Sequence, residues 1–299
     1  MVGEALVDLV ISPSGEVDAA LGGAPYNTAR ACGRLGADVA FVGAVSRDRF
    51  GGLLAAQLRS DGVDVSSAPR VDEPTTLAAA ELDDDGAATY RFYIAGTSAP
   101  ALVTVPPVQA DVLFTGGLAL VLEPMANTVE AMVAGSAGDE VVMVDVNCRP
   151  RVVPDRDRYV ERVERVLEGT DIVKVSDDDL QYLWPDLEPL AAGRAMLARG
   201  PRAVLVTAGA EGVHVLTREG ARVVPADPVT VVDTVGAGDT FGAGFLVAWT
   251  EHGSVDDRDE LDDLDRLAVA AGFGARVAGV VCGRRGADPP WRHELDETD

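Results

Sequence analysis

The sequence predicts an α/β protein: a doubly wound, mostly parallel sheet flanked by helices, with a small lid of β-strands. Two observations support this fold class. Short, nearly continuous apolar runs alternate with helical patterns along most of the 299 residues, as is typical of successive βαβ units. One early segment breaks this alternation and has the pattern of a hairpin, which predicts a small second unit.

The strands expected in the main sheet are rich in Val, Ile, Leu and Phe. Because most of them lack an alternation of apolar and polar residues, we expect them to be covered on both faces. They lie at 38–45, 111–115, 141–147, 171–176 and 203–207, after a first strand that begins almost at Met1. Helices are expected at 48–60, 124–134, 156–168, 189–199, 239–249 and 261–281.

Two hairpins are expected outside this alternation. Extended arms at 75–82 and 88–93 flank the turn signal Asp-Asp-Asp-Gly at 83–86, and a second pair lies at 213–216 and 221–224. The first hairpin is either a flap over a site or a surface hairpin without a role. We expect a core formed by residues 1–10, 21–70 and 100–299, and a β lid formed by 11–20 and 71–99.

Charge and cysteine content exclude several classes of protein. The chain has 49 acidic and 25 basic residues, a net charge of −24, which opposes binding to nucleic acid or to an anionic membrane. No apolar run approaches the roughly 20 residues of a membrane-spanning helix, and no basic segment opens a secretory signal. The spacing of the cysteines Cys32, Cys148 and Cys282 fits neither a disulfide framework nor a zinc site, so we expect reduced core thiols and a cytoplasmic protein.

The most informative segment is 233–244, with the sequence DTVGAGDTFGAG. An extended run leads into a glycine turn and then a helix, whose first amides form an anion site with the help of the helix dipole. Asp239 lies at the start of that helix. An ionised carboxylate beside an anion site supplies a base for a hydroxyl proton and donors for a phosphoryl group.

The alternative is an ordinary turn in which Asp239 caps the helix. Two other phosphate motifs are absent. No Gly-Lys pair occurs, so there is no Walker A loop. Phe241 stands where a dinucleotide-binding turn has its third glycine.

A second glycine turn lies at 22–27, with the sequence GGAPYN, and opens a helix that runs to Leu35. Pro25 suits the first turn of a helix. Asn27 lies one turn into this helix, and Asp8 is expected at the end of the first strand. Helix starts and strand ends share the rim of such a sheet where ligands bind, and a carboxylate with an amide can bind several sugar hydroxyls. Taken singly, each of these residues is more often a helix-capping residue than a ligand contact.

These motifs together resemble the ribokinase (PfkB-type) family. GG-x-x-x-N at 22–27 with RLGA at 34–37, and DT-x-GAGD-x-F at 233–241, resemble its two signatures. Three intermediate segments resemble family motifs in the same order: DVNCRP at 145–150, VKVS-x-x-D at 173–179 and VT-x-G-x-x-G at 206–212. The resemblance covers nearly the whole chain and implies a ribokinase-like fold and transfer of a phosphoryl group from ATP.

Carried over to this sequence, the resemblance assigns roles to single residues. The expected catalytic group consists of the base Asp239 and an anion hole formed by Gly236, Ala237 and Gly238. The expected sugar contacts are Asp8, Gly22, Gly23 and Asn27, with Asn147 and Arg149 between sugar and nucleotide. The expected nucleotide contacts are Lys174, the only lysine of the chain, with Thr207, Gly209 and Gly212.

The resemblance also implies Mg²⁺, and in some members a monovalent cation such as K⁺. Asp179 stands at the metal position, where the family usually has glutamate, so its shorter side chain is expected to reach Mg²⁺ through water. Residues 272–275 lack the asparagine or serine often found near the adenine, which leaves base selectivity open. The hairpin, with residues 11–20, resembles the family's β lid, which closes on the sugar and in many members forms a homodimer.

Three functions remain open. Residues 3–8 and 22–25 are most similar to fructokinases, which favours a free monosaccharide, such as the ketohexose fructose, as acceptor. A nucleoside kinase of the same fold needs an aromatic base pocket, but only 5% of the residues are aromatic. A sugar-binding regulator without turnover would show a replaced base or a broken anion hole, and both motifs are intact here.

Overall fold

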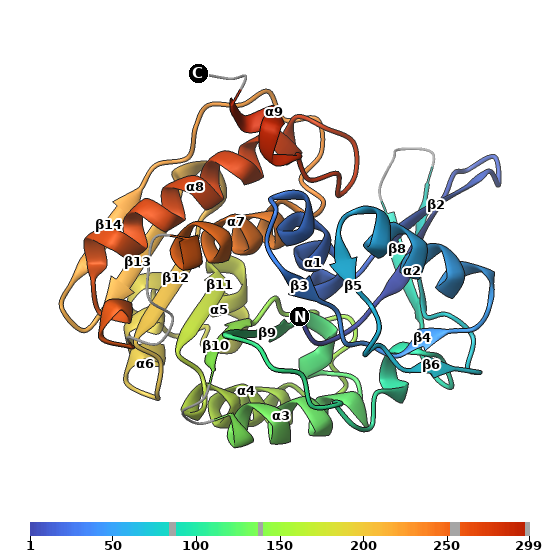
Figure 1. The fold of residues 1–299 in the computed structure, drawn as a ribbon, viewed down its shortest axis with the longest axis horizontal. Helices are drawn as coiled ribbons and strands as arrows, with labels where there is room; N and C mark the ends of the chain where they lie inside the picture. The colour runs from blue at the N-terminus through green and yellow to red at the C-terminus, as the bar shows by residue number, and fades with distance from the viewer. Residues whose placement is uncertain (84–87, 137–139, 252–257, 297–299) are drawn as a thin grey trace.

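A computed structural model describes residues 1–83, 88–136, 140–251 and 258–296 (Figure 1). Its main sheet has the strand order β14-β13-β12-β11-β10-β9. The parallel strands are β9 (Val112–Gly116), β10 (Val141–Asp145), β11 (Ile172–Ser176) and β12 (Ala203–Thr207). The expected second hairpin, β13 (Val213–Thr217) with β14 (Ala221–Val224), extends this sheet in antiparallel fashion. The predicted fold class is confirmed.

Helices cover both faces of the main sheet (Figure 1). They are α1 (Ala24–Arg34), α2 (Arg49–Ser60), α3 (Met125–Gly135), α4 (Arg156–Glu168), α5 (Asp177–Leu183), α6 (Pro189–Leu197), α7 (Ala237–Glu251), α8 (Leu264–Cys282) and α9 (Arg292–Asp296). Each of the predicted helices is present within a few residues, whereas the short α5 and α9 were not predicted. Several begin at side-chain caps: Asp48 accepts a hydrogen bond from the amide of Gly51, and Asp155 from that of Arg158.

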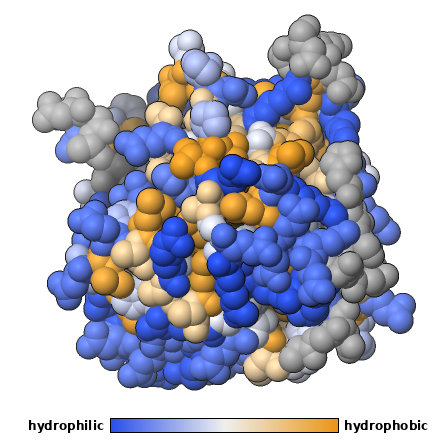
Figure 2. Space-filling view, turned by 90° about the vertical axis from the view of Figure 1, so that its left-hand side faces the viewer, coloured by the Kyte–Doolittle hydropathy of each residue, from blue (hydrophilic) through white to orange (hydrophobic). Residues whose placement is uncertain are grey.

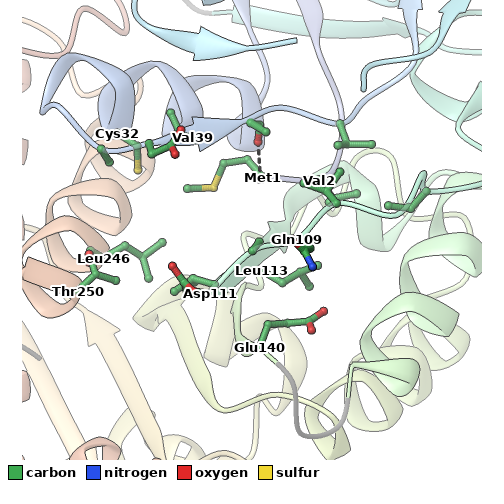
Figure 3. A pocket seen from close by; sticks show the side chains of 18 of the residues that line it. Met1, Val2, Cys32, Val39, Gln109, Asp111, Leu113, Glu140, Leu246 and Thr250 are labelled. Carbon is green, nitrogen blue, oxygen red and sulfur yellow. Dashed lines mark hydrogen bonds between the residues drawn. The ribbon is translucent and has the colours of Figure 1, made fainter. Parts of the chain in front are cut away.

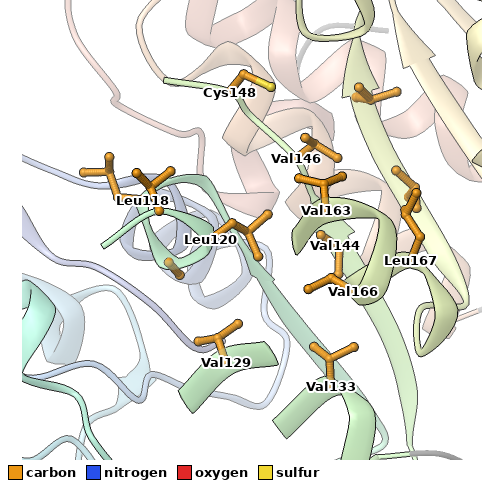
Figure 4. Close-up of a cluster of buried hydrophobic side chains, with 14 of the residues drawn as sticks. Leu118, Leu120, Val129, Val133, Val144, Val146, Cys148, Val163, Val166 and Leu167 are labelled. Carbon is orange, nitrogen blue, oxygen red and sulfur yellow. The ribbon is translucent and has the colours of Figure 1, made fainter. Parts of the chain in front are cut away.

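The sheet buries side chains on both faces because successive residues of a strand point to opposite sides. Val144 of β10 packs toward α3 and α4, in the cluster of Figure 4, while Met143 packs with Phe241 and Phe245 of α7. This double burial explains why the strands have continuous apolar sequences. The face shown in Figure 2 is mostly hydrophilic with scattered apolar side chains. No helix in the described parts of the chain is long and apolar enough to cross a membrane.

Val2 and Gly3 lie between strand β9 and the segment that contains Val42. The amide of Val2 donates to Phe114 O at 2.8 Å, and the amide of Gly3 donates to Val42 O at 3.1 Å. The single strand predicted at 38–45 is wrong. It is divided into β3 (Val39–Ala40) and β4 (Val45–Ser46), which pair with β5 (Val63–Asp64) and β6 (Arg70–Val71). The chain passes so close to Gly3 between them that a Cβ atom at Gly43 would lie 2.3 Å from Gly3 O.

A separate four-stranded sheet has the order β2-β1-β7-β8. Its strands are β1 (Leu6–Ile11), β2 (Val17–Gly22), β7 (Leu77–Leu82) and β8 (Ala88–Tyr93). The two predicted arms form an antiparallel pair, although the turn expected at 83–86 lies mostly outside the described residues. Strand β1 pairs with both β2 and β7 in this sheet. The division of the chain into core and lid at the residues given above stays a prediction.

All three cysteines are free thiols, as the sequence predicts. Cys32 and Cys148 are buried, whereas Cys282 is only partly buried and is therefore not a core thiol.

Candidate active site

The start of α7 has the shape of an anion site. Gly236 has a φ of 77°, and a Cβ atom there would lie 2.5 Å from the Cβ of Ala287, so the turn requires glycine. The amide of Ala237 donates to Thr234 O at 3.2 Å. Within the described ranges, no group accepts a hydrogen bond from the amides of Gly236, Gly238 and Asp239. Three backbone donors at this turn and helix N-terminus therefore remain available to an anion.

Asp239 is buried beside these amides, with 8% of its surface exposed. Its Oδ2 accepts a hydrogen bond from Asn27 Nδ2 at 2.8 Å, across 212 positions of sequence. Burial raises the pKa of Asp239, the bond from Asn27 and the charges of Lys174 and Arg149 oppose this rise, and the charge of Asp8 adds to it. No backbone amide donates to this carboxylate among the described residues, so Asp239 does not act as a helix cap.

Asn27 belongs to the rim that α1 and β1 form over Asp239. Its Oδ1 is buried without a hydrogen-bond partner, so it can accept a bond from a hydroxyl group. Asp8 lies in the middle of β1, not at the end of the strand as the sequence suggested. A Cβ atom at Gly22 would lie 2.4 Å from Asp8 Oδ2. Burial raises the pKa of Asp8 to about 6, and the charge of Arg149 opposes the rise.

Arg149 connects these acidic groups to the end of β10. Its Nη1 donates to Asn147 Oδ1 and, at 3.0 Å, to Cys148 O. Asn147 has a φ of 40°, a left-handed conformation that asparagine tolerates better than most residues. The guanidinium charge of Arg149 influences the pKa values of Asp8 and Asp239. Arg149 thus lies near enough to Asp8 and Asp239 to act on their charges, and the position of Asn147 and Arg149 between sugar and nucleotide stays a prediction.

Lys174 lies below the anion site and forms a buried ion pair. Its Nζ donates to Asp145 Oδ2 at 2.8 Å, and the two side chains are 5% and 1% exposed. A Cβ atom at Gly238 would lie 3.2 Å from this Nζ. Burial raises the pKa of Asp145 to about 6, while the charge of Lys174 lowers it. Lys174 is therefore not a solvated charge at a strand end.

Three of the residues predicted to contact the nucleotide lie at the end of β12 or just after it: Thr207, Gly209 and Gly212. Ser176 and Thr207 are register partners at the ends of β11 and β12. Gly209 has a φ of 50° and open space on its side-chain face. At Gly212, by contrast, a Cβ atom would lie 2.1 Å from Val224 O, so this glycine is required by its packing against β14.

Asp179 is engaged by the backbone on both oxygens. Oδ1 accepts a bond from the Cys148 amide at 2.7 Å, and Oδ2 from the Ser176 amide at 3.0 Å in a capping box. The described residues contain no group of three or more His, Cys, Asp or Glu that could hold a metal ion. Mg²⁺ is often held by one or two carboxylates with substrate phosphates and water. Asp179 and the unpartnered Oδ1 of Asp145 are donors of the right chemistry.

A further cavity lies beside the start of β9 and the late turns of α7, away from the site residues described so far (Figure 3). It has a volume of about 780 Å³ and is lined by the start of β9, including Asp111 and Leu113, and by Leu246 and Thr250 late in α7. The Met1 amino group beside it donates to Ala40 O at 2.8 Å, and burial lowers its pKa to about 6. None of the predicted site residues lines this cavity.

Two acidic residues near the site were not predicted as site residues. Asp145 occurs in a recognised motif, but its pairing with Lys174 depends on the register of β10 and β11. Glu4 is 2% exposed and contacts backbone amides that are distant in sequence. A sequence signal for Asp145 was its partner, because Lys174 is the only lysine in a chain that otherwise uses arginine.

The chain is similar to known proteins over most of its length. The family model described as pfkB family carbohydrate kinase matches residues 1–294. A fructokinase of Rhizobium leguminosarum bv. trifolii is 37% identical over 280 residues, which cover 90% of this chain and 85% of the relative. A fructokinase of Salmonella typhimurium is 33% identical over 93% of this chain and 92% of its own length.

Solved structures show the same fold. The fructokinase of Xylella fastidiosa with bound ATP has a TM-score of 0.87 and 27% identity, over 99% of this chain and 97% of that one. The fructokinase of Vibrio cholerae O395 in its fructose, ADP and calcium ion bound form has a TM-score of 0.84 and 25% identity, over 99% and 97% of the two chains. The predicted resemblance is confirmed along nearly the whole length: the chain belongs to the pfkB family of carbohydrate kinases.

Proposed function

We propose that this kinase transfers the γ-phosphoryl group of ATP to a hydroxyl of a ketohexose, with fructose as the preferred acceptor. The observation that carries the proposal is the buried Asp239 carboxylate, held by Asn27 beside the available amides of Gly238 and Asp239. The similarity to fructokinases from several organisms supports the choice of sugar.

Sugar recognition is assigned to the rim over Asp239. The carboxylate of Asp8 and the unpartnered Oδ1 of Asn27 accept bonds from sugar hydroxyls. Gly22 and Gly23 are assigned to the same rim, where a Cβ atom would lie 2.4 Å from Asp8 Oδ2 and 2.7 Å from Glu4 O, respectively, so neither position has room for a side chain. Asn147 and Arg149 lie between the sugar and the nucleotide, and Arg149 balances the charges of Asp8 and Asp239.

The chemical step follows from the same residues. The attacking hydroxyl passes its proton to Asp239, whose pKa is raised by burial, which makes its carboxylate a stronger base than that of an exposed aspartate. The transferred group has a loose transition state, so its charge must be met by positioned donors. The amides of Gly238 and Asp239 supply these donors, and the Lys174 ammonium lies directly below them. Gly236 gives the turn its conformation.

The nucleotide is assigned to the edge formed by Thr207 and Gly209, with Gly212 fixing the loop against β14. When bound, Mg²⁺ neutralises charge on the phosphates. Asp179, through water, and Asp145 are the carboxylates that would hold it. A variant of the Vibrio cholerae O395 fructokinase has been solved in a fructose, ADP and potassium ion bound form, which supports a monovalent cation as a further ligand.

The four-stranded sheet is assigned the role of a lid that excludes water from the reaction. Val10 and Tyr90 on this sheet are 39% and 50% exposed, which favours a homodimer in which the lids of two copies cover each other. The three unpaired cysteines favour a cytoplasmic protein.

Measuring ADP release with a panel of acceptors tests the proposed substrate. The panel contains fructose, glucose, ribose, a 2-keto-3-deoxy sugar acid and adenosine. We expect kcat/KM for fructose to exceed that for adenosine by at least about tenfold, because Asp8 and Asn27 offer acceptors to sugar hydroxyls and only 5% of the chain is aromatic. A tenfold preference for adenosine would overturn the proposal. Sugar binding without turnover for any acceptor would favour a regulator instead.

A further inference from the structure

Glu4 is a buried acid that the mechanism above does not use. It lies between the segment paired with Phe114 and strand β1, and only 2% of its surface is exposed. No ion pair is found for it in the described parts of the chain. Its carboxylate is instead surrounded by backbone amides, so this charge is compensated mainly by hydrogen bonds.

Those amides belong to two different elements. Oε1 accepts bonds from the amide of Ala24 at 3.1 Å, the first residue of α1, and from that of Leu118 at 3.3 Å, in the 3-10 helix η2 (Gly117–Leu120). Oε2 accepts a bond from the amide of Ala119 at 3.2 Å. Gly23 is the cap residue of α1 and gives no side-chain cap. Glu4 therefore caps α1 from another part of the chain.

The backbone closes tightly around this carboxylate. A Cβ atom at Gly23 would lie 2.7 Å from Glu4 O, and one at Gly117 would lie 2.9 Å from Glu4 Oε1. Both glycines have positive φ values, 118° and 60°. The Leu118 side chain joins the buried cluster of Figure 4, which anchors η2 to the main core. The three bonds thus tie the start of α1 to a rigid part of the molecule.

The start of α1 also carries the residue that holds Asp239. Asn27 donates its own amide to Gly23 O at 2.8 Å and its side chain to Asp239 Oδ2 at 2.8 Å. A shift of the first turn of α1 relative to η2 would move Asn27 against α7. We propose that Glu4 is a positioning residue. Its carboxylate holds the first turn of α1 in place, so that Asn27 orients Asp239 for turnover.

The protonation state of Glu4 makes this role testable. Burial raises its pKa to about 7, while its own backbone amide, the amides of Ala24 and Leu118 and the charge of Arg149 oppose the rise. Arg149 is the charged side chain that faces Glu4, since the first turn of α1 has no acidic residue and η2 contributes amides only. Protonation places a hydrogen on one oxygen and weakens its bonds to the amides. Turnover is therefore expected to fall as the pH drops through about 7.

The test compares the pH profiles of kcat for the wild type and Glu4→Gln, using whichever sugar of the acceptor panel is turned over. Glutamine has one acceptor oxygen and resembles the protonated acid. We expect kcat of the variant to be lower by at least about tenfold at about pH 8, with a nearly unchanged KM for ATP. The ratio of the two kcat values should shrink toward one as the pH falls below 7. The titrations of Asp8, Asp145 and Asp239 are common to both proteins and cancel in this ratio.

Two further measurements separate positioning from a general effect on folding. Glu161→Gln, at an exposed acid on α4, should leave the kcat profile unchanged. In the wild type, the NMR signals of the Ala24, Leu118 and Ala119 amides should titrate together with a midpoint near the acidic limb of kcat. A constant ratio across the pH range, or amide signals that do not titrate there, would overturn the proposal. The inference rests on the proposed role of Asp239. If fructose is not the acceptor, only the choice of sugar fails, because the amide titration needs no substrate.

Discussion

The Asp239 carboxylate is buried and bonded by the side chain of Asn27, and it lies beside available amides. Asp239→Asn keeps the size of the side chain but removes the proton acceptor. We expect kcat to fall by at least about 10²-fold, while ATP and sugar still bind and the melting temperature changes little. Steady-state kinetics, calorimetric binding and a melting curve on this variant check the prediction. Near-normal turnover would contradict the role of Asp239 as the base.

The buried pair of Lys174 and Asp145 makes a second prediction at this scale. The sequence predicts Lys174 as a nucleotide contact, and the burial of its ammonium near Gly238 indicates that a substitution there affects stability as well as catalysis. Lys174→Met leaves Asp145 as an unpaired buried charge, which is expected to reduce the free energy of unfolding by about 3–5 kcal/mol.

The double variant Lys174→Met with Asp145→Leu removes both charges at once. We expect it to recover most of the stability, because two apolar side chains replace a costly buried ion pair. Its turnover should remain low, since the positive charge below the anion site is missing. Denaturant unfolding and kinetics of the wild type and both variants check this. If the double variant recovered turnover together with stability, Lys174 would have a structural role only.

The motifs predicted several site residues because local patterns carry them: a glycine turn before a helix identifies Asp239 and Asn27 without knowledge of the fold. Glu4 and Asp145 were missed because their partners lie far away in sequence. The amides that bind Glu4 belong to residues 24, 118 and 119, and Asp145 meets Lys174 through strand pairing. Gly212 as a nucleotide contact stays a prediction, and its close approach to Val224 O depends on tertiary packing that no local pattern reveals.

At the scale of elements, the strand predicted at 38–45 also failed because contacts with distant residues decide its structure. The apolar run is genuine, but the tight contact between Gly43 and Gly3 bends the chain, and each half pairs with a different partner. Strands β10, β11 and β12 were predicted well because burial on both faces leaves a continuous apolar sequence.

The lid sheet contacts the core through a cation–π interaction. The Arg151 guanidinium lies 5.0 Å from the centre of the Tyr90 ring on β8. Removing the ring in Tyr90→Ala should cost about 1 kcal/mol or less of contact energy. We expect the KM for sugar to rise about two- to fivefold, because the closed lid becomes less populated, with little change in melting temperature.

Tyr93→Ala is the matched control, because Tyr93 lies on the same strand and is similarly exposed, at 52% compared with 50%. No ring contact is found for it among the described residues. Equal effects of the two substitutions on the KM for sugar would show that general changes to β8, and not the contact with Arg151, govern sugar affinity.

At the scale of the whole molecule, the net charge of −24 opposes the proposed homodimer. Two copies repel each other at long range, and salt reduces this repulsion, since the screening length falls from about 30 Å at 0.01 M to about 8 Å at 0.15 M ionic strength. The lid offers apolar contacts to a second copy: Val10 of β1 and Tyr90 of β8 are each paired in register with Ala80 of β7, so they share one face of the sheet.

We therefore expect the dissociation constant of the dimer to decrease by at least about tenfold over this range of ionic strength. Sedimentation equilibrium measures it, as the mass rises from the 31.1 kDa of one chain toward twice that value. Val10→Glu adds a charge to the apolar face and should keep the protein monomeric in both conditions, whereas Val269→Glu, at a valine of α8 that is 68% exposed, should not. A mass of one chain at every protein and salt concentration would rule out the dimer, and a dimer insensitive to Val10→Glu would place the interface away from the lid.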